Sequence, residues 1–169
     1  MCSLLHVTRR NGSLTLYSSI VNQKVLKKQL VKLGYTVSIA NHGIEAISFL
    51  STTRYSAAHQ ADGTDLSVVL MDSEMPVMDG LSCVRRIREM QDEGALVAHV
   101  PVIAITANAR IEQVDAALVA GMDDIITKPF RVPELVARVE RLLCVIKDRE
   151  GEGCTVGGLG SKRRAGQIG

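Results

Sequence analysis

The stretch LSVVLMDSEMPVMDG, residues 66–80, joins an apolar run to a loop that carries three carboxylates. The run at 66–71 is aliphatic and rich in β-branched residues, which is typical of a parallel strand covered on both faces. Asp72 follows the run directly, and Glu74 and Asp79 follow in the loop. Such carboxylates suit a metal cage, an acid–base pair, a nucleophile or an ordinary acidic loop. Their chemistry therefore depends on the polar residues that share their part of the fold.

Strand-like and helix-like segments alternate along the chain. The expected strands are 13–17, 35–40, 66–71, 100–106 and 124–127, and the expected helices are 21–34, 43–51, 79–93, 109–121 and 132–147. Residues 52–65 carry no periodicity and are expected to form a loop. Helices between apolar strands imply right-handed crossovers and a parallel sheet with helices on both faces. The sequence therefore predicts an α/β fold of five strand–helix units.

The first predicted helix is amphipathic, with an apolar face opposite a row of lysines. The expected core residues are Val25, Leu26, Leu30 and Leu33, and the lysines are Lys24, Lys27, Lys28 and Lys32. Val31 lies among the lysines, so this outer face is either a docking surface or a solvated basic face.

Composition excludes several classes of protein. With 169 residues, 46% hydrophobic and 22% charged, the chain suits one globular domain. A net charge of +2 and an aromatic content of 3% do not favour nucleic-acid binding. The four cysteines never form a CxxC pair, so structural zinc is not expected. No run reaches the ~18 apolar residues of a membrane helix, so we expect a cytoplasmic or nuclear protein without membrane contact.

The domain organisation follows from the same patterns. We expect residues 1–12 to be an N-terminal extension and residues 13–147 to form the folded domain. Residues 148–169 are rich in glycine and polar residues, and we expect them to form a disordered tail.

Three polar residues lie at the ends of three different predicted strands: Asp72, Thr106 and Lys128. Ligands of open parallel sheets bind outside the carboxyl ends of the strands. A carboxylate can attack phosphorus to form an acyl phosphate, and an ammonium and a hydroxyl can bind the phosphoryl oxygens. Mg²⁺ would complete such a site through one or two carboxylates and the phosphate itself. Taken singly, each residue also suits an ordinary structural role at the end of a strand.

The sequence around these residues resembles the receiver domain of response regulators, and most of all the C-terminal receivers of fungal-type hybrid histidine kinases. The matching segments are VVLMDSEMPVMDGL (68–81), PVIAITANA (101–109) and AGMDDIITKPF (120–130), with weaker support from VNQKVL (21–26). The resemblance implies a flavodoxin-like (βα)5 three-layer sandwich with a parallel five-stranded sheet in the order 2-1-3-4-5.

The resemblance also implies residue roles in a phosphorelay. Asp72 would accept a phosphoryl group from a phosphohistidine on a histidine phosphotransfer protein or a histidine kinase. Lys128 would contact the phosphate, and Thr106 would be the switch hydroxyl. Asp72 and the backbone carbonyl of Glu74 would be ligands of Mg²⁺. The chain itself would not be an enzyme, and any kinase activity would belong to a longer parent protein.

Two backbone features are implied as well. The Lys128–Pro129 peptide bond would be cis, and Asp79 with Gly80 would turn the chain into the third helix. The plainer interpretation of Glu74 and Asp79 is that they are loop and cap residues.

Two positions depart from the family pattern. The family places two adjacent acids at the end of the first strand, where this chain has Tyr17 and Ser18. Because neither is anionic at neutral pH, we expect Mg²⁺ affinity to fall at least about 10–100-fold. Either the domain is a degenerate, phosphorylation-poor receiver that acts as a protein-interaction module, or residues 1–19 differ from the segment that the ancestral domain used. Ile125 also stands where the family usually carries an aromatic residue.

Overall fold

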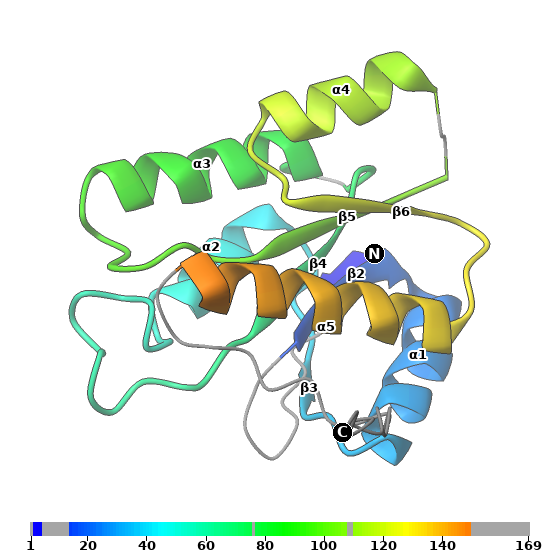
Figure 1. Ribbon diagram of the computed structural model, residues 1–169, viewed down its shortest axis with the longest axis horizontal. Helices are drawn as coiled ribbons and strands as arrows, with labels where there is room; N and C mark the ends of the chain where they lie inside the picture. Colours follow the sequence, from blue (N-terminus) through cyan, green and yellow to red (C-terminus); the bar gives the residue numbers. More distant parts are fainter. Residues whose placement is uncertain (1, 5–13, 76, 108–109, 150–169) are drawn as a thin grey trace, which may run out of the picture.

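The structure is a computed structural model, and it describes residues 2–4, 14–75, 77–107 and 110–149. Its strands are β1 (Cys2–Leu4), β2 (Leu14–Ser19), β3 (Val37–Ser38), β4 (Val68–Asp72), β5 (Val102–Thr106) and β6 (Asp124–Thr127). Its helices are α1 (Ile20–Lys32), α2 (Gly43–Leu50), α3 (Gly80–Asp92), α4 (Ile111–Val119) and α5 (Val132–Arg149) (Figure 1). The predicted α/β fold is confirmed, and no described helix is long and apolar enough to cross a membrane.

The sheet is parallel apart from one pairing. β4 pairs with β2 and β5, β5 pairs with β6, and the two residues of β3 pair with β2, all in parallel. The parallel strands therefore run in the order β3-β2-β4-β5-β6. The strand expected at 35–40 is shorter than predicted. β1 was not predicted, and it pairs antiparallel with the second half of β2.

The structure describes only part of the predicted N-terminal extension and of the predicted tail. Most of the predicted N-terminal extension, residues 1–12, and most of the predicted tail, residues 148–169, lie outside the described residues. α5 continues through Arg149, two residues beyond the predicted helix.

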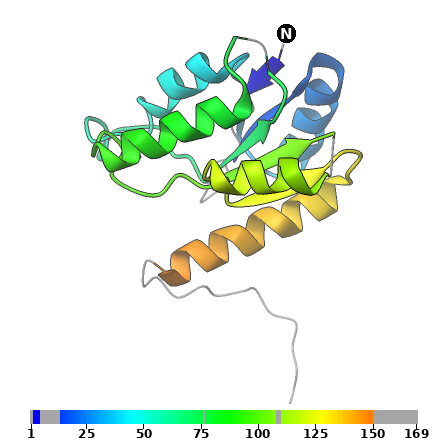
Figure 2. The ribbon, with the colours of Figure 1, turned by 90° about the horizontal axis from the view of Figure 1, so that it is seen from above.

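Both faces of the sheet are covered by helices (Figure 2). Val69 and Met71 of β4 belong to a core cluster that includes residues of α2, α3 and α4. Val68 and Leu70 belong to a second cluster that includes residues of α1 and α5. Because alternate side chains of a strand point to opposite faces, this double burial accounts for the uninterrupted apolar run.

α1 buries a narrower stripe than the sequence predicted. Leu26 and Leu30 are buried, whereas Val25 is 54% exposed and Leu33 is 53% exposed. The prediction was therefore wrong for Val25 and Leu33. Leu26 and Leu30 are one helical turn apart, whereas Val25 points about 100° away from Leu26 and Leu33 follows the last residue of the helix.

The loop at 52–65 lacks helices and strands, as predicted, but backbone hydrogen bonds hold it in place. The amide of Arg54 donates to the carbonyl of Thr64 over 3.1 Å, which closes the loop on itself. The amide of Ala57 donates to the carbonyl of Ala95 over 3.0 Å. The loop is therefore attached to the connection between α3 and β5, at the end of the sheet where the central strands begin.

β6 is the last strand of the sheet, and one side chain covers its free side. Arg138 of α5 donates from Nη1 to the carbonyl oxygen of Ile125 over 3.0 Å. The same nitrogen lies 2.9 Å from Oδ1 of Asp124. The guanidinium therefore binds a backbone acceptor that the sheet itself leaves unpaired.

Candidate functional site

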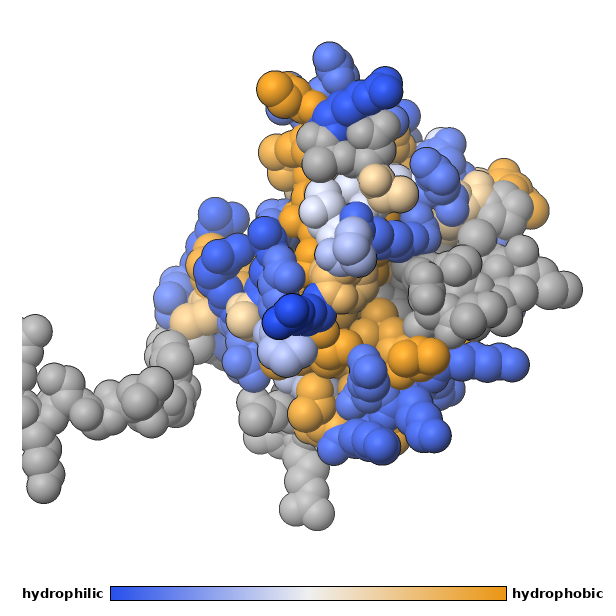
Figure 3. Space-filling view, turned by 90° about the vertical axis from the view of Figure 1, so that its right-hand side faces the viewer, coloured by the Kyte–Doolittle hydropathy of each residue, from blue (hydrophilic) through white to orange (hydrophobic). Residues whose placement is uncertain are grey.

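The predicted site residues lie at one edge of the sheet, where the parallel strands end. Asp72 is the last residue of β4 and Thr106 the last of β5, while Lys128 follows β6 directly. The register pairs Asp72 with Ile105 and Thr106 with Thr127. Figure 3 looks onto this side of the molecule, where β6 leads into α5, and shows hydrophobic surface between hydrophilic flanks.

An ion pair joins two of the three residues. Nζ of Lys128 lies 2.5 Å from Oδ2 of Asp72, whose residue is only 5% exposed. The other oxygen, Oδ1, accepts a hydrogen bond of 3.2 Å from the backbone amide of Glu74. Because a buried carboxylate is costly unless it is paired and hydrogen-bonded, these two contacts compensate for the burial of the Asp72 side chain.

Thr106 is tied to the same edge through its backbone. Its carbonyl oxygen accepts a hydrogen bond of 2.8 Å from the amide of Lys128. The residue is 7% exposed, so it is nearly as buried as Asp72. The end of β5 therefore fixes the point from which the lysine side chain reaches toward Asp72.

The turn into α3 has the features that the resemblance implied. Asp79 is the N-cap of α3, and its Oδ1 accepts a hydrogen bond of 2.7 Å from the amide of Ser82. Gly80 packs against the backbone of Asp72, where a Cβ atom would lie 2.5 Å from the carbonyl oxygen. The Lys128–Pro129 peptide bond is cis, which confirms that expectation.

The neighbouring strand ends without an acidic side chain. Leu16 of β2 pairs with Leu70 of β4, and the next two residues of β2 are Tyr17 and Ser18. The backbone of β2 therefore runs toward the edge where β4 ends in Asp72. In the sequence, the neutral residues Tyr17 and Ser18 occupy the two positions where the family pattern has its acidic pair.

The residues present do not fit Mg²⁺ well. Mg²⁺ prefers carboxylate and phosphate oxygens in octahedral geometry. Asp72 supplies a single carboxylate that is already paired with Lys128, and Asp79 is engaged in capping α3. Within the described ranges, no three His, Cys, Asp or Glu residues are grouped as metal ligands would be. The arrangement instead suits an anionic phosphoryl group beside one lysine.

A shallow groove lies beside β6. Its volume is about 300 Å³, and its lining comes from α4, the residue before β6, β6 itself and α5: Val114, Leu118, Asp123, Asp124, Ile125, Thr127, Glu134 and Arg138. Ile125, which replaces the family's usual aromatic residue, is part of this lining.

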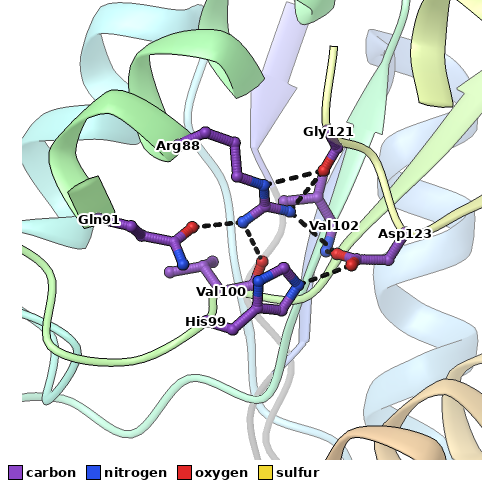
Figure 4. A network of polar contacts seen from close by, with 7 residues as sticks. All are labelled: Arg88, Gln91, His99, Val100, Val102, Gly121 and Asp123. Atoms are coloured by element: carbon purple, nitrogen blue, oxygen red, sulfur yellow. Dashed lines mark hydrogen bonds and ion pairs between the residues drawn. The ribbon is translucent and has the colours of Figure 1, made fainter. Parts of the chain in front are cut away.

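A second polar cluster lies at the opposite end of the strands, where β5 and β6 begin, and centres on Arg88 of α3 (Figure 4). The sequence did not predict this cluster. Nε of Arg88 donates to the carbonyl oxygen of Gly121 over 2.9 Å, and Nη1 donates to that of Val100 over 2.9 Å. Nη2 lies 3.0 Å from Oδ2 of Asp123. Oδ1 of Asp123 lies 2.6 Å from Nε2 of His99. The cluster links α3 to the residues that precede β5 and β6.

Burial lowers the pKa of the Arg88 guanidinium from its ordinary value, and the charge and hydrogen bond of Asp123 oppose this shift. No motif announces the cluster, because its members are isolated in the sequence. Only the fold brings Arg88 and Asp123 together.

Comparison with known proteins agrees with this geometry. Residues 19–140 match the response regulator receiver domain. The chain belongs to this family. The match begins after Tyr17 and Ser18, so the two departing positions lie just outside it.

The receiver has relatives in several kinds of signalling protein. It is 32% identical over 127 residues to hybrid signal transduction histidine kinase I of Dictyostelium discoideum. This alignment covers 73% of this chain and 7% of that protein. It is 33% identical over 118 residues to response regulator MprA of Mycobacterium leprae, covering 70% of this chain and 44% of MprA. The chain thus spans less than half of the length of these relatives.

Solved receiver structures have the same fold. The receiver domain of sensor histidine kinase PA1611 from Pseudomonas aeruginosa, with a magnesium ion coordinated in its active site cleft, is 34% identical with a TM-score of 0.61. The alignment covers 77% of this chain and 93% of that one. The receiver domain of the TMAO respiratory system response regulator TorR is 26% identical, also with a TM-score of 0.61, and covers 79% of this chain and 95% of that one.

Proposed function

We propose that this receiver accepts a phosphoryl group on Asp72 from a phosphohistidine, carried by a histidine phosphotransfer protein or a histidine kinase. The observation that carries this proposal is the ion pair between the buried Asp72 and the partly buried Lys128 at the carboxyl edge of the sheet. Membership of a family of phosphorelay receivers supports it. Residues 13–147 would form the functional unit, as part of a hybrid kinase of the fungal type.

The chemistry follows from the side chains. A carboxylate oxygen of Asp72 attacks phosphorus, an acyl phosphate bond forms, and the phosphorus–nitrogen bond breaks with its electron pair returning to the imidazole. The ammonium of Lys128 leaves its contact with the free carboxylate and neutralises a phosphoryl oxygen. The hydroxyl of Thr106 donates to a second phosphoryl oxygen. Glu74 supports the acceptor through its backbone amide.

The test uses the purified chain and phosphoramidate, a small phosphoryl donor. Mass spectrometry of the intact protein should show the addition of one phosphoryl group, and peptide mapping should place it on Asp72. Asp72→Asn should abolish the addition, whereas Asp79→Asn is the matched control because Asp79 caps α3. Labelling that persists in Asp72→Asn would contradict the proposed acceptor.

A second candidate function is a phosphorylation-poor receiver that binds protein partners through its surface. Tyr17 and Ser18 at the end of β2 favour this alternative, because they supply no negative charge for Mg²⁺. The double variant Tyr17→Glu, Ser18→Asp separates the candidates. If only the double variant gains a phosphoryl group, and only with Mg²⁺ present, the second candidate is correct. If neither chain gains one, the missing acidic pair is not the main defect.

A further inference from the structure

The formal charges of the two paired residues at the candidate site cancel. Nζ of Lys128 lies 2.5 Å from Oδ2 of Asp72, so one positive charge faces one negative charge. The loop that follows carries two more carboxylates, Glu74 and Asp79, but both residues are exposed and Asp79 caps α3. Solvent therefore screens their charges. Such a site repels an incoming phosphoryl anion less than a group of unpaired carboxylates does.

The lysine is held in this position. Its backbone amide donates to the carbonyl oxygen of Thr106, at the end of β5, over 2.8 Å. Its side chain is 25% exposed and reaches a carboxylate whose side chain is 8% exposed. Because water screens the ammonium only in part, it acts on Asp72, and on a group bound to Asp72, more strongly than a surface lysine does.

A magnesium ion has little to gain at this site. Mg²⁺ prefers one or two carboxylates together with phosphate oxygens, and it gives up its water ligands reluctantly. Both oxygens of Asp72 are already bound, Oδ2 by Lys128 and Oδ1 by the amide of Glu74. The end of the neighbouring strand β2 contributes Tyr17 and Ser18, which are neutral at neutral pH. A metal ion therefore has to share one carboxylate with an ammonium that repels it.

We propose that Asp72 is phosphorylated without Mg²⁺ and that Lys128 supplies the positive charge of this step. The inference rests on the proposed function of Asp72 and adds that the acceptor needs no metal ion.

The step balances with the small donor phosphoramidate. A carboxylate oxygen of Asp72 attacks phosphorus, the oxygen–phosphorus bond forms, and the phosphorus–nitrogen bond breaks with its electron pair leaving on ammonia. The carboxylate and the phosphoramidate monoanion each bring one negative charge, and the acyl phosphate keeps both. The ammonium of Lys128, which already touches Oδ2, offsets one of these charges.

The first experiment measures the Mg²⁺ dependence of the full chain. Phosphoramidate is added in excess EDTA or in millimolar Mg²⁺, and mass spectrometry of the intact protein follows the phosphorylated fraction with time. The two initial rates should agree within about twofold, whereas a metal that takes part through its ligands contributes about 10–100-fold. A rate with Mg²⁺ that exceeds the rate in EDTA by more than this margin would overturn the inference.

Lys128→Met tests the source of the positive charge. The variant keeps an unbranched side chain and should lose at least about tenfold in rate in EDTA. Lys147→Met is the matched control, because Lys147 is an exposed lysine in the last turn of α5 and its loss changes the net charge equally. Circular dichroism shows whether each variant is folded. A folded Lys128→Met that reacts at the wild-type rate in EDTA would exclude the role of Lys128.

The double variant Tyr17→Glu, Ser18→Asp tests the charge argument while it leaves Lys128 in place. It adds two negative charges at the end of β2, so phosphoramidate should react more slowly with it in EDTA and recover in Mg²⁺. Mn²⁺, a paramagnetic substitute for Mg²⁺, gives a readout that is independent of phosphorylation. It should broaden the amide NMR signal of Glu74 in the double variant at concentrations that leave the wild-type signal unchanged. Equal broadening in the two chains would contradict the inference.

The outcomes separate this inference from the proposed function. If the wild-type chain gains a phosphoryl group only with Mg²⁺, the inference is wrong and Asp72 stands as the acceptor. If the wild-type chain gains none in either buffer, the proposed function fails and the inference fails with it. If Asp72→Asn is still phosphorylated in EDTA, another residue carries the group and both are wrong.

Discussion

Asp123 accepts two hydrogen bonds on a single oxygen, and one of them comes from Arg88 of α3. Oδ2 of Asp123 lies 3.0 Å from Nη2 of Arg88 and accepts a hydrogen bond of 2.8 Å from the amide of Val102. One carboxylate therefore fastens α3 to the start of β5. Because β5 ends in Thr106, this contact also helps to hold the strand that leads to the candidate site.

Arg88→Met should destabilise the protein. It leaves Asp123 partly buried without its counter-charge and leaves the carbonyl groups of Gly121 and Val100 without their donor, at a cost of about 3 kcal/mol. Urea unfolding measures this loss. Arg86→Met on the same helix is the control, because Arg86 pairs with Glu89 and Glu93 in solvent. An equal fall in the free energy of unfolding in the two variants would show that the buried cluster stabilises the protein no more than the exposed ion pairs of Arg86 do.

Gly80→Ala should also destabilise the protein, and Gly43→Ala less so. Both glycines are the first residue of a helix, so the smaller loss of backbone entropy that alanine brings should stabilise both helices to a similar extent. At Gly80 the new Cβ meets the backbone of Asp72, which cannot move aside, and the overpacking should cost about 1–3 kcal/mol. At Gly43 the nearest atoms are those of the Met78 side chain, which can rotate. The difference between the two variants is measured by urea unfolding, and a larger loss for Gly43→Ala would contradict this account.

Cys83 gives the protein a pH dependence at high pH. Burial and then the charge of Asp79 raise the pKa of its thiol from 9.0 to about 12. Between these values the unfolded chain loses the thiol proton while the folded chain keeps it, so the unfolded state gains stability as pH rises. The free energy of unfolding should fall by about 1.4 kcal/mol for each pH unit in this window because of Cys83 alone.

The measurement is the difference between the wild type and Cys83→Ala in urea unfolding at several pH values from 8 upward. The lysines and tyrosines titrate in both proteins, so their effects cancel in the difference. Below the unfolded pKa the difference should be constant, and above it the stability of the wild type should fall faster. Parallel profiles over the whole range would contradict the raised pKa.

Much of the site could be predicted from the sequence because its residues follow apolar strands. Asp72 and Thr106 each end such a run, and parallel strands bring their carboxyl ends to one edge. The N-cap role of Asp79 was predictable for the same local reason, since it precedes glycine and an amphipathic helix. These features depend on the residue and its immediate neighbours.

Other features depend on distant contacts and could not be predicted. Arg88 and Asp123 come together only after β5 and β6 have paired. Val77, in the loop between β4 and α3, has a φ of +69°, and a valine does not signal such a conformation in the sequence. The exposure of Val25 was not predicted because Val25 lies at the border of the apolar stripe, where the helical pattern fits either a buried or an exposed side chain.

Arg138 has a consequence for how copies of this receiver meet at high concentration. A free strand at the border of a sheet is a template on which another molecule can add its own strand, which is a common start of aggregation. On β6 the carbonyl of Ile125 is already occupied and the guanidinium projects from this border. A second chain would have to break that bond and displace a charged side chain before it could extend the sheet, so we expect Arg138 to hinder polymerisation through β6.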